Sequence, residues 1–385
     1  MLGGGAAGLF CAMTAGQRGR QVRVLERANR VGKKILMSGG GRCNFTNLKV
    51  EARHFLSANP HFCKSALARY APADFIARVE AHGIAFHEKE LGQLFCDDSA
   101  RQIVQMLLDE CAQVDVRIDT DCEVTHVERT PEGFVVQTSL GELRAGKLVV
   151  ATGGLSIPSL GGSAYGYDLA RQFGHELQST RAGLVPLTLS GRPLEDWSVL
   201  SGVSLPVAAR SGGAEFSNAM LLTHRGLSGP ALLQISNYWQ PGEPLHIDLL
   251  PGHEALEFLR ERQAAQPDAE LRTVLGSELP KRFAQQFCEV MAPSQPMKRY
   301  TPAALREIAQ KLEQWPVTPS GTEGYRTAEV TLGGVATHEI SSVSFESKRV
   351  PGLYFIGEVL DVTGWLGGYN FQWAWASAHA CGEAL

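Results

Sequence analysis

The sequence lacks several features that would each indicate a particular class of protein. No uninterrupted apolar run reaches the about 18 residues of a membrane span, and the apolar stretch 371–380 is broken by Gln372, Ser377 and His379. No two of the eight cysteines stand at C-x-x-C or C-x4-C spacing, which argues against a zinc site, and indeed any metal site, and against a redox-active disulfide. No G-x-S-x-G motif is present, so hydrolase chemistry has no support.

An excess of positive charge is also missing. The 36 lysines and arginines are outnumbered by 40 acidic residues, and the net charge is -4. A chain of this charge has no general attraction to nucleic acid or to anionic membranes. We therefore expect a small molecule as substrate, no nucleic acid as partner and no insertion into a membrane, with the oligomeric state left open. Scattered thiols without a secretory signal predict a cytoplasmic location.

The length and composition are those of a globular protein with more than one domain. At 385 residues the chain fits two or three domains of the usual size, about 100 to 200 residues each. A hydrophobic content of 44% and a charged content of 20% are ordinary for such a protein.

A glycine-rich turn stands at the start of the sequence. Gly3 would allow a tight turn, Gly5 a close approach of the backbone to a pyrophosphate, and Gly8 the close packing of a helix on its sheet. A helix from about Ala7 to Arg18 would point its positive end at the phosphates. Glu26 follows Gly8 by eighteen positions, near the spacing of a carboxylate that binds a ribose 2′-hydroxyl. The pattern predicts a dinucleotide-binding βαβ unit and favours FAD or NAD over NADP.

The strand expected before this turn is unusually short. Only Met1 and Leu2 precede Gly3, whereas a strand usually has about 5 to 6 residues. We expect that several apolar residues of the natural N-terminus are missing from the chain, because the fold would otherwise lack its central sheet element.

The order of the predicted elements indicates an α/β fold. Helical periodicity appears in 73–82 and 100–112, followed by short β segments at 114–118, 122–127 and 134–138. A buried strand, Lys147 to Val150, ends in the turn 151–154. This order is that of a Rossmann-like nucleotide-binding domain, which we expect to be discontinuous and to comprise residues 1–185 and 326–385.

The residues between these two parts have a different composition, and we expect them to form an inserted domain over 186–325. Its first part, about 186–250, is predicted to be β, and its second part, about 251–325, helical. The expected strands are 185–189, 203–209, 219–223 and 245–249. The expected helices are 254–266, 270–291 with a break at Pro280, and 302–314.

A long motif near the end of the sequence suggests the second half of a cofactor site. A hydrophobic strand, 352–356, ends in Gly357 and Glu358, whose carboxylate could bind a ribityl hydroxyl. The glycine turn 364–368 then starts the last helix. The positive end of that helix could face the pyrimidine edge of a flavin and stabilise its reduced, anionic form.

These motifs together resemble the HI0933-like flavoprotein family, also called the BaiN/YhiN-type NAD(P)/FAD-dependent oxidoreductases. The matching pieces extend along the whole chain: 3–8, 32–44, 151–154, 331–335 and 357–375. The resemblance implies a glutathione-reductase-2-type FAD domain with an insertion, FAD bound without a covalent bond, and NAD(P)H as electron donor. Many relatives read Thr-Gly-Gly-Tyr-Asn where this chain has Trp365 and Leu366 before Gly367, so the substrate side around Trp365 is expected to differ.

The motifs and the resemblance define a predicted cofactor-binding set. It comprises Gly3, Gly5, Ala6, Ala7, Gly8, Glu26, Arg27, Lys33, Lys34, Ser38, Gly39, Gly40, Arg42, Cys43, Asn44, Val124, Ala151, Thr152, Gly153, Gly154, Gly357, Glu358, Asp361, Gly367, Gly368, Tyr369, Asn370 and Phe371. Within it, Lys33, Lys34 and Arg42 could instead be a solvated basic face, and Cys43 a packing residue rather than a thiol beside the flavin. The catalytic residue is open, with Arg42, His224, Arg225 and Tyr369 as candidates. His224 and Arg225 could equally belong to a plain turn.

Three functions remain open at this stage. The first is an FAD-dependent oxidoreductase that transfers hydride at flavin N5 to or from a small organic substrate, with an activated carbon–carbon double bond as one possible acceptor. No second G-x-G-x-x-G is present, because the run 161–166 fails at its third position, so a nicotinamide would bind only transiently. The second is an oxidase of an amine-type substrate that uses O2. The third is a flavin-binding protein that senses redox state without catalysis.

Overall fold

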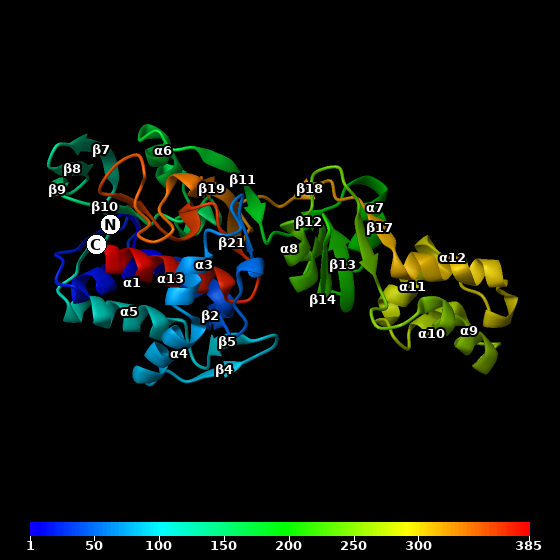
Figure 1. Cartoon of the computed structure of the whole chain (residues 1–385). Coiled ribbons are helices and arrows are strands. Elements are labelled where there is room, and N and C mark those ends of the chain that lie inside the picture. The colour runs from blue at the N-terminus through cyan, green and yellow to red at the C-terminus, as the bar shows by residue number, and fades with distance from the viewer. The chain divides into compact units, whose positions relative to one another are not determined.

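A computed structural model describes residues 1–385, which divide into two compact units. Unit 1 comprises Met1–Ala182 and Val330–Leu385, and it contains both ends of the chain (Figure 1). Unit 2 comprises Gly183–Glu329. None of the helices is both long enough and apolar enough to cross a membrane.

Unit 1 is built around a parallel sheet whose middle position is held by Leu2. Leu2 forms parallel bridges with Leu25 on one side and Val150 on the other. The Leu2 N–H donates to the Val149 carbonyl at 2.8 Å, and the Ala151 N–H donates to the Leu2 carbonyl at 2.9 Å. The paired strands on the two sides are β1 (Arg23–Leu25) with β6 (Arg117–Asp119), and β10 (Leu148–Val150) with β20 (Leu353–Phe355). The expected central element is therefore present, although it consists of a single bridging residue.

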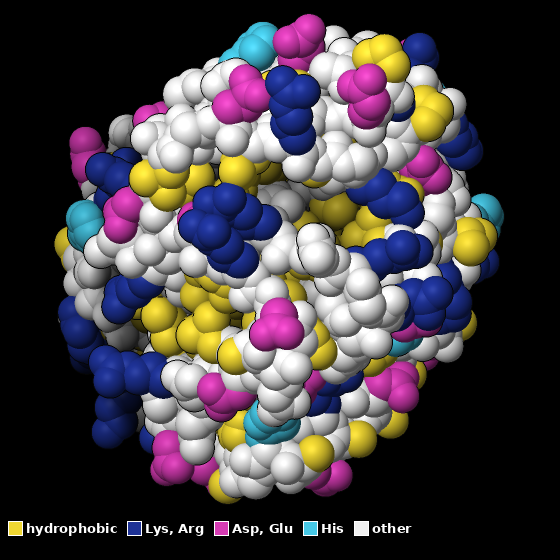
Figure 2. Space-filling model, turned by 90° about the vertical axis from the view of Figure 1, so that its left-hand side faces the viewer, with side chains coloured by type: hydrophobic (Ala, Val, Ile, Leu, Met, Phe, Trp, Pro, Cys, Tyr) yellow, Lys and Arg dark blue, Asp and Glu magenta, His cyan; other side chains and the backbone are white.

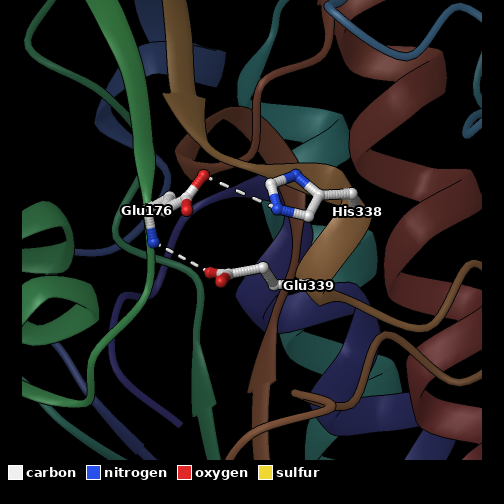
Figure 3. A group of neighbouring side chains, drawn as sticks. All are labelled: Glu176, His338 and Glu339. Atoms are coloured by element: carbon white, nitrogen blue, oxygen red, sulfur yellow. Dashed lines mark hydrogen bonds and ion pairs between the residues drawn. The ribbon is translucent and has the colours of Figure 1, made fainter.

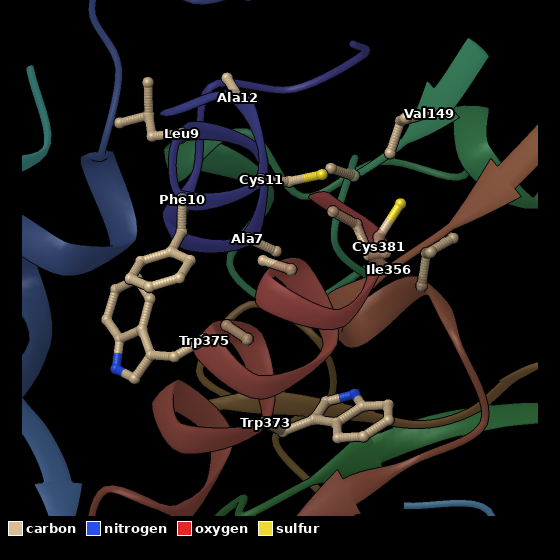
Figure 4. Close-up of a cluster of buried hydrophobic side chains, with 14 of the residues drawn as sticks. Ala7, Leu9, Phe10, Cys11, Ala12, Val149, Ile356, Trp373, Trp375 and Cys381 are labelled. Carbon is tan, nitrogen blue, oxygen red and sulfur yellow. The ribbon is translucent and has the colours of Figure 1, made fainter. Parts of the chain in front are cut away.

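The first and last helices pack against each other beside this sheet. Helix α1 (Ala6–Gln17) and helix α13 (Tyr369–Ala384) approach so closely that a Cβ at Gly382 would lie 2.6 Å from Thr14 Cβ. On α13, Trp373 and Trp375 point to different sides of the helix (Figure 4), and both are fully buried. The Trp375 ring stacks on Phe75 at 4.4 Å. Both tryptophans are therefore core residues, as their spacing of two positions indicates.

Smaller sheets and helices complete unit 1. Helix α5 (Arg101–Gln113) is amphipathic and buries its apolar face, which includes Ile103 and Leu107. The three-stranded sheet β2-β5-β4 consists of Asn44–Asn47, Gln93–Cys96 and Phe86–Glu88. The remaining elements are α2 (Lys33–Met37), β3 (Phe55–Leu56), α3 (Lys64–Arg69), α4 (Pro72–Ala81), β7 (Val124–Thr130), β8 (Gly133–Thr138), β9 (Gly141–Ala145), α6 (Tyr165–Gln172), β11 (Leu177–Gly183), β19 (Val330–Val335) and β21 (Thr363–Gly364).

Unit 2 contains a seven-stranded sheet in the order β17-β16-β13-β14-β15-β12-β18 and a group of helices. Its strands are β12 (Leu187–Thr188), β13 (Ser204–Ser211), β14 (Ala214–Thr223), β15 (Gly226–Ser228), β16 (Leu245–Asp248), β17 (Trp315–Val317) and β18 (Gly321–Thr322). Its helices are α7 (Gly191–Ser198), α8 (Pro230–Ser236), α9 (Ala255–Ala265), α10 (Leu271–Leu275), α11 (Lys281–Val290) and α12 (Pro302–Glu313). The break at Pro280 separates α10 from α11, because proline has no N–H to continue a helix.

The two units are joined through neighbouring strands. Strand β11 pairs with β19 in a two-stranded sheet. Directly beyond them, the Glu329 N–H donates to the Leu184 carbonyl at 3.2 Å. The chain therefore leaves unit 1 and returns to it side by side.

Candidate functional site

The first glycine turn has three crowded glycines, Gly3, Gly4 and Gly8, and one open one, Gly5. A Cβ on Gly3, whose φ is +104°, would lie 2.5 Å from the Ala151 carbonyl oxygen, and a Cβ on Gly8 would lie 1.9 Å from the Gly3 oxygen. A Cβ on Gly5 would meet no atom within 4 Å. Gly5 precedes α1, and no side chain caps the first N–H groups of that helix. The turn therefore presents bare backbone donors, at Ala6 and Ala7, to open space at the positive end of a helix, which suits a pyrophosphate.

Glu26 lies directly after β1 and faces this turn. Its carboxylate accepts hydrogen bonds from the Gly4 N–H at 2.8 Å and from the Ala28 N–H at 2.7 Å. A carboxylate has about four acceptor positions, so two remain for the hydroxyls of a ribose. Arg27 beside it is exposed, and Val124 begins β7.

A charged network joins four separate segments of unit 1. Lys34 on α2 donates to Ser156 Oγ at 2.6 Å and to Glu358 at 2.9 Å, and Ser156 donates to the other Glu358 oxygen at 2.9 Å. The Thr331 N–H also donates to Glu358, at 3.0 Å. Lys34 and Glu358 keep 30% and 22% of their side chains exposed, so the network lies at a surface that a ligand can reach. Lys33, the first residue of α2, is half-buried and has no acidic partner within 4 Å.

The turn after β10 packs against this network. A Cβ on Gly154 would lie 2.5 Å from Thr331 Oγ1, and a Cβ on Gly153 3.7 Å from Glu358. Ala151 and Thr152 lead into this turn at the end of the strand. Thr331 Oγ1 accepts the N–H groups of Leu155 at 2.8 Å and Ser156 at 3.1 Å. Thr331 was not singled out from the sequence, although it lies in a run that matches the family.

The glycine loop Ser38–Gly41 has left-handed backbone at three successive glycines, Gly39, Gly40 and Gly41. Its neighbour Cys43 is fully buried, and burial raises the pKa of its thiol well above the usual range. A buried thiol with a raised pKa is unreactive, which supports the interpretation of Cys43 as a packing residue. Arg42 is exposed, and its carbonyl accepts the Cys96 N–H. Asn44 begins β2.

The second glycine turn, 364–368, is held by side chains from several segments. The Asn370 side chain accepts the Gly364 N–H at 2.8 Å and donates to the carbonyls of Gly364 and Trp365. A Cβ on Gly368, at φ +91°, would lie 2.3 Å from the Thr46 carbonyl oxygen. Gly367 lies against the Gln93 side chain, where a Cβ would approach to 3.1 Å. Asn370 thus shapes the turn, and the positive end of α13 lies directly behind it.

The other predicted residues of this region have mainly packing roles. Asp361 accepts the Ala58 N–H at 2.8 Å, and burial raises the pKa of its carboxyl. Phe371 stacks on Trp375 at 5.7 Å. A Cβ placed on Gly357, whose φ is +71°, would lie 2.9 Å from the Ala7 Cβ. Gly357 therefore packs directly against the start of α1.

An aromatic group beside the second turn was missed by the sequence analysis. The His54 ring lies 4.8 Å from both the Trp365 and the Tyr369 rings, measured between centroids. His54 Nδ1 accepts the Glu51 N–H at 3.0 Å, and burial lowers the pKa of the imidazole. Burial also raises the pKa of the Tyr369 phenol, so that phenol is protonated at neutral pH. No local motif marks His54, because its neighbours come from residues more than 300 positions later.

The structure places all the predicted cofactor residues in unit 1 and two catalytic candidates in unit 2. His224 and Arg225 form the turn between β14 and β15, and Arg225 lies 3.8 Å from Glu323 in an ion pair. This arrangement is that of a tight hairpin turn.

A separate group of polar side chains stabilises unit 1 away from these turns. Glu176, His338 and Glu339 bring their ligand-type atoms within 4.8 Å of one another (Figure 3). The Glu339 carboxylate, however, already accepts the Glu176 N–H at 2.8 Å, lies 3.1 Å from His175 Nδ1 and pairs with Arg349. The group therefore links β11 to the loop after β19.

Comparison with known proteins agrees with this geometry. The family model described as the HI0933-like protein Rossmann domain matches residues 1–384. The chain belongs to this family. It is 54% identical, over its whole length and 97% of the relative, to a protein of Escherichia coli named ribosomal RNA dihydrouridine synthase. It is 50% identical to the protein of the same name in Haemophilus influenzae, again over its whole length and 97% of the relative.

Two further comparisons concern a more distant relative and a fold neighbour. The chain is 31% identical, over its whole length and 98% of the relative, to the 3-dehydro-bile acid delta(4,6)-reductase of Clostridium scindens. The structure of an E. coli quinol fumarate reductase FrdA variant superposes with a TM-score of 0.52 at 15% identity, covering 99% of this chain and 68% of that one. The protein is thus an enzyme, a flavin-dependent oxidoreductase with a Rossmann-type FAD-binding domain.

The prediction that no nucleic acid is a partner is wrong. It is contradicted by two relatives at 54% and 50% identity that are named for their action on ribosomal RNA. The prediction failed because net charge averages over the whole chain and does not report local charge. Residues 27–50 carry six lysines and arginines and no acidic residue. On the face in Figure 2, lysine and arginine side chains gather beside hollows with apolar walls.

Proposed function

We propose that the protein reduces a uridine of ribosomal RNA to dihydrouridine, with FAD as its bound cofactor. The observation that carries the proposal is the 54% identity over the whole chain to a ribosomal RNA dihydrouridine synthase. The proposal includes a cytoplasmic location, where ribosomal RNA is found.

The residues of unit 1 fit FAD in one orientation, with its pyrophosphate at the first glycine turn and its ring near the second. The open backbone at Gly5 and the first N–H groups of α1 would hold the pyrophosphate, and Glu26 the adenosine ribose. The Lys34 and Glu358 network would hold the ribityl hydroxyls. The ring would lie between the loop 38–41 and the positive end of α13, so that its reduced form is stabilised by backbone donors.

The chemistry is the reduction of an activated double bond. The C5=C6 bond of uracil is conjugated with the C4 carbonyl, so a hydride adds at C6, a proton adds at C5, and the bond becomes single. Bound FAD would supply the hydride from N5 after it has been reduced, and NAD(P)H is our proposed reductant, giving up two electrons as it becomes NAD(P)⁺. Among the candidates, Tyr369 is a protonated phenol beside the ring end of the site and is our choice for the proton donor. Exposed Arg42 would bind a carbonyl or a phosphate.

The experiment uses ribosomal RNA from a strain that lacks the gene for this enzyme. Purified protein with FAD and either NADH or NADPH should form dihydrouridine in that RNA, detected by mass spectrometry of its nucleosides as uridine plus two hydrogen atoms. Anaerobic mixing with each nicotinamide should bleach the flavin absorbance if it is the direct donor. RNA that gains no dihydrouridine with any reductant would contradict the proposal.

A second candidate is the reduction of a small conjugated ketone, and it is favoured by the relative named as a bile acid reductase, at 31% identity. The two reactions share the activated alkene and differ in substrate size. A steroid dienone that is reduced faster than uridine in RNA, under the same conditions, would favour this candidate.

A further inference from the structure

Two leucines in unit 1 lie side by side on the surface beside the second glycine turn. Leu48 follows β2 and is 48% exposed, and Leu91 precedes β5 and is 64% exposed. Their segments are joined by the Leu48 N–H, which donates to the Gly92 carbonyl at 2.8 Å. Leu91 has φ +52°, a left-handed conformation that is uncommon for a bulky residue. The exposure of both leucines and the left-handed backbone of Leu91 cost free energy, which points to a role outside the fold.

A buried asparagine fixes the leucines to the turn. The Asn47 side chain is 1% exposed and donates to the Leu91 carbonyl at 3.2 Å and to the Gly367 carbonyl at 2.9 Å. Its oxygen accepts the Lys49 N–H at 2.8 Å. The two leucines therefore hold a fixed position at the start of α13, where the flavin ring is proposed to lie.

Charged side chains flank the leucines, and a lysine stands on each side of the pair. Lys49 and Lys89 are exposed, and the Lys89 ammonium lies 5.7 Å from the centre of the Phe95 ring. Of the nearby acids, Glu88 accepts the Gly92 N–H at 3.1 Å and Glu51 pairs with Arg53, while Glu90 is exposed. The segment 27–50, whose charged residues are all lysine or arginine, ends beside these leucines. An aliphatic pair with lysines on both sides fits an anionic polymer with apolar ring faces, which is a nucleic acid.

We propose that Leu48 and Leu91 form a wedge that enters between two bases of an RNA loop and keeps the target uridine out of its stack, while Lys49 and Lys89 bind the flanking phosphates. This inference rests on the proposed function. A uracil ring must leave its stack before one of its faces can receive a hydride. Apolar side chains inserted between bases are a known means of unstacking nucleic acids.

The test compares matched pairs of exposed apolar residues. Leu48→Ala with Leu91→Ala removes the wedge. Leu140→Ala with Val343→Ala is the control, because Leu140 and Val343 are 59% and 61% exposed elsewhere in unit 1. Equal flavin content and equal melting temperature of the two double variants establish that both are folded.

The readout is independent of catalysis. A stem-loop RNA with 2-aminopurine beside a loop uridine becomes more fluorescent when the neighbouring base leaves its stack. The wild type and the control should raise this fluorescence at saturating protein, and the wedge variant should not. Dihydrouridine formation should fall about tenfold or more in the wedge variant. A tenfold change corresponds to about 1.4 kcal/mol, and unstacking one base step costs at least that much.

The lysines are tested by salt. Lys49→Gln with Lys89→Gln should make the slope of log affinity against log salt shallower by about 1.4, at about 0.7 for each phosphate contact on a single strand. An unchanged slope would overturn the role of the lysines.

The outcomes separate this proposal from the proposed function. If the wedge variant still raises the fluorescence and forms dihydrouridine at the control rate, the wedge is refuted while the function stands. If the wild type forms no dihydrouridine in ribosomal RNA, the proposed function fails, and the wedge fails with it.

Discussion

The two glycine turns of unit 1 serve one proposed cofactor but are stabilised in different ways. In the first turn, 3–8, backbone packs on backbone at Gly3 and Gly8, the Glu26 side chain accepts the Gly4 N–H, and only Gly5 is open. The second turn, 364–368, is held by side chains, among them Asn47 of the distant strand β2 and Asn370 of the helix that follows the turn. Both turns can be recognised in the sequence by their glycines, whereas the distant side chain that holds the second turn can be identified only in the folded chain.

The largest effect should come from the crowded position of the first turn. In Gly8→Ala the new Cβ would lie 1.9 Å from the Gly3 oxygen, so α1 must move away from the sheet. We expect a loss of about 3 kcal/mol or more in the free energy of unfolding, the upper end of overpacking costs, measured by urea denaturation. Gly19→Ala, at a glycine with no neighbour within 4 Å but with φ +79°, controls for the backbone cost of replacing a glycine. Equal losses in both variants would refute the close packing at Gly8.

The next effect tests the dependence of the second turn on a distant side chain. Asn47→Ala leaves the buried carbonyl of Gly367 without this donor, and we expect a loss of about 2 kcal/mol in the free energy of unfolding, within the range for a buried group left unsatisfied. FAD affinity should fall as well, because the turn loosens. Asn59→Ala, which changes an asparagine of unit 1 that is only half-buried, serves as the control. If the stability and the FAD affinity both stay at the wild-type values, the second turn does not depend on the Asn47 side chain.

The open position of the first turn should affect the cofactor and not the fold. Gly5 has φ −83° and ψ −168°, which alanine adopts readily, and a Cβ there meets no protein atom. Gly5→Ala should therefore keep the wild-type melting temperature of the apoprotein. FAD should bind about tenfold more weakly, a change of about 1.4 kcal/mol, because the methyl group takes the place of the pyrophosphate. Calorimetric titration with FAD measures this, and unchanged affinity would place the pyrophosphate elsewhere.

The smallest expected effect is on the pH dependence of stability, and it concerns His54 beside the second turn. Burial lowers the pKa of His54, so the folded protein favours the neutral ring. Its contribution to stability is complete above the unfolded pKa of about 6.5 and is lost as the pH falls through the lower folded value. His54→Asn keeps an acceptor for the Glu51 N–H and should reduce the loss of stability between neutral and acidic pH.

Urea midpoints of the wild type and of His54→Asn at pH 7.5 and pH 5.5 measure that difference. Part of the acid sensitivity should persist in the variant, because burial also lowers the pKa of His175 and His379. The same acid sensitivity in both proteins would show that His54 does not couple the second turn to pH.

The sequence predicted what short-range patterns determine. The bounds of α9, α11 and α12 agree with the expected helices within about one residue, whereas α10 ends at Leu275, before the break at Pro280, and α7 and α8 were not expected. The spacing of Gly3, Gly5, Gly8 and Glu26 predicted elements that lie together in the fold. The Rossmann-type fold and the family are confirmed. These features depend on local geometry, which repeats wherever a strand, a glycine turn and a helix follow one another.

The parts that the sequence did not predict depend on contacts between distant segments. Thr331, His54 and Asn47 are ordinary polar residues in the sequence, and each acquires its role from partners brought together by folding. Only Met1 and Leu2 precede the first turn, and the sequence did not indicate that Leu2 alone bridges the strands on both sides. The partner was missed because a balanced total charge conceals a local excess of lysine and arginine.

The paired strands β11 and β19 have a consequence for how this family can change. Since the polypeptide exits and re-enters through hydrogen-bonded neighbours, residues 184–329 could be exchanged by genetic recombination for another module with closely spaced ends. Every predicted cofactor residue lies outside that segment. One continuous piece of the gene could therefore be replaced while every residue proposed to bind the flavin is inherited intact.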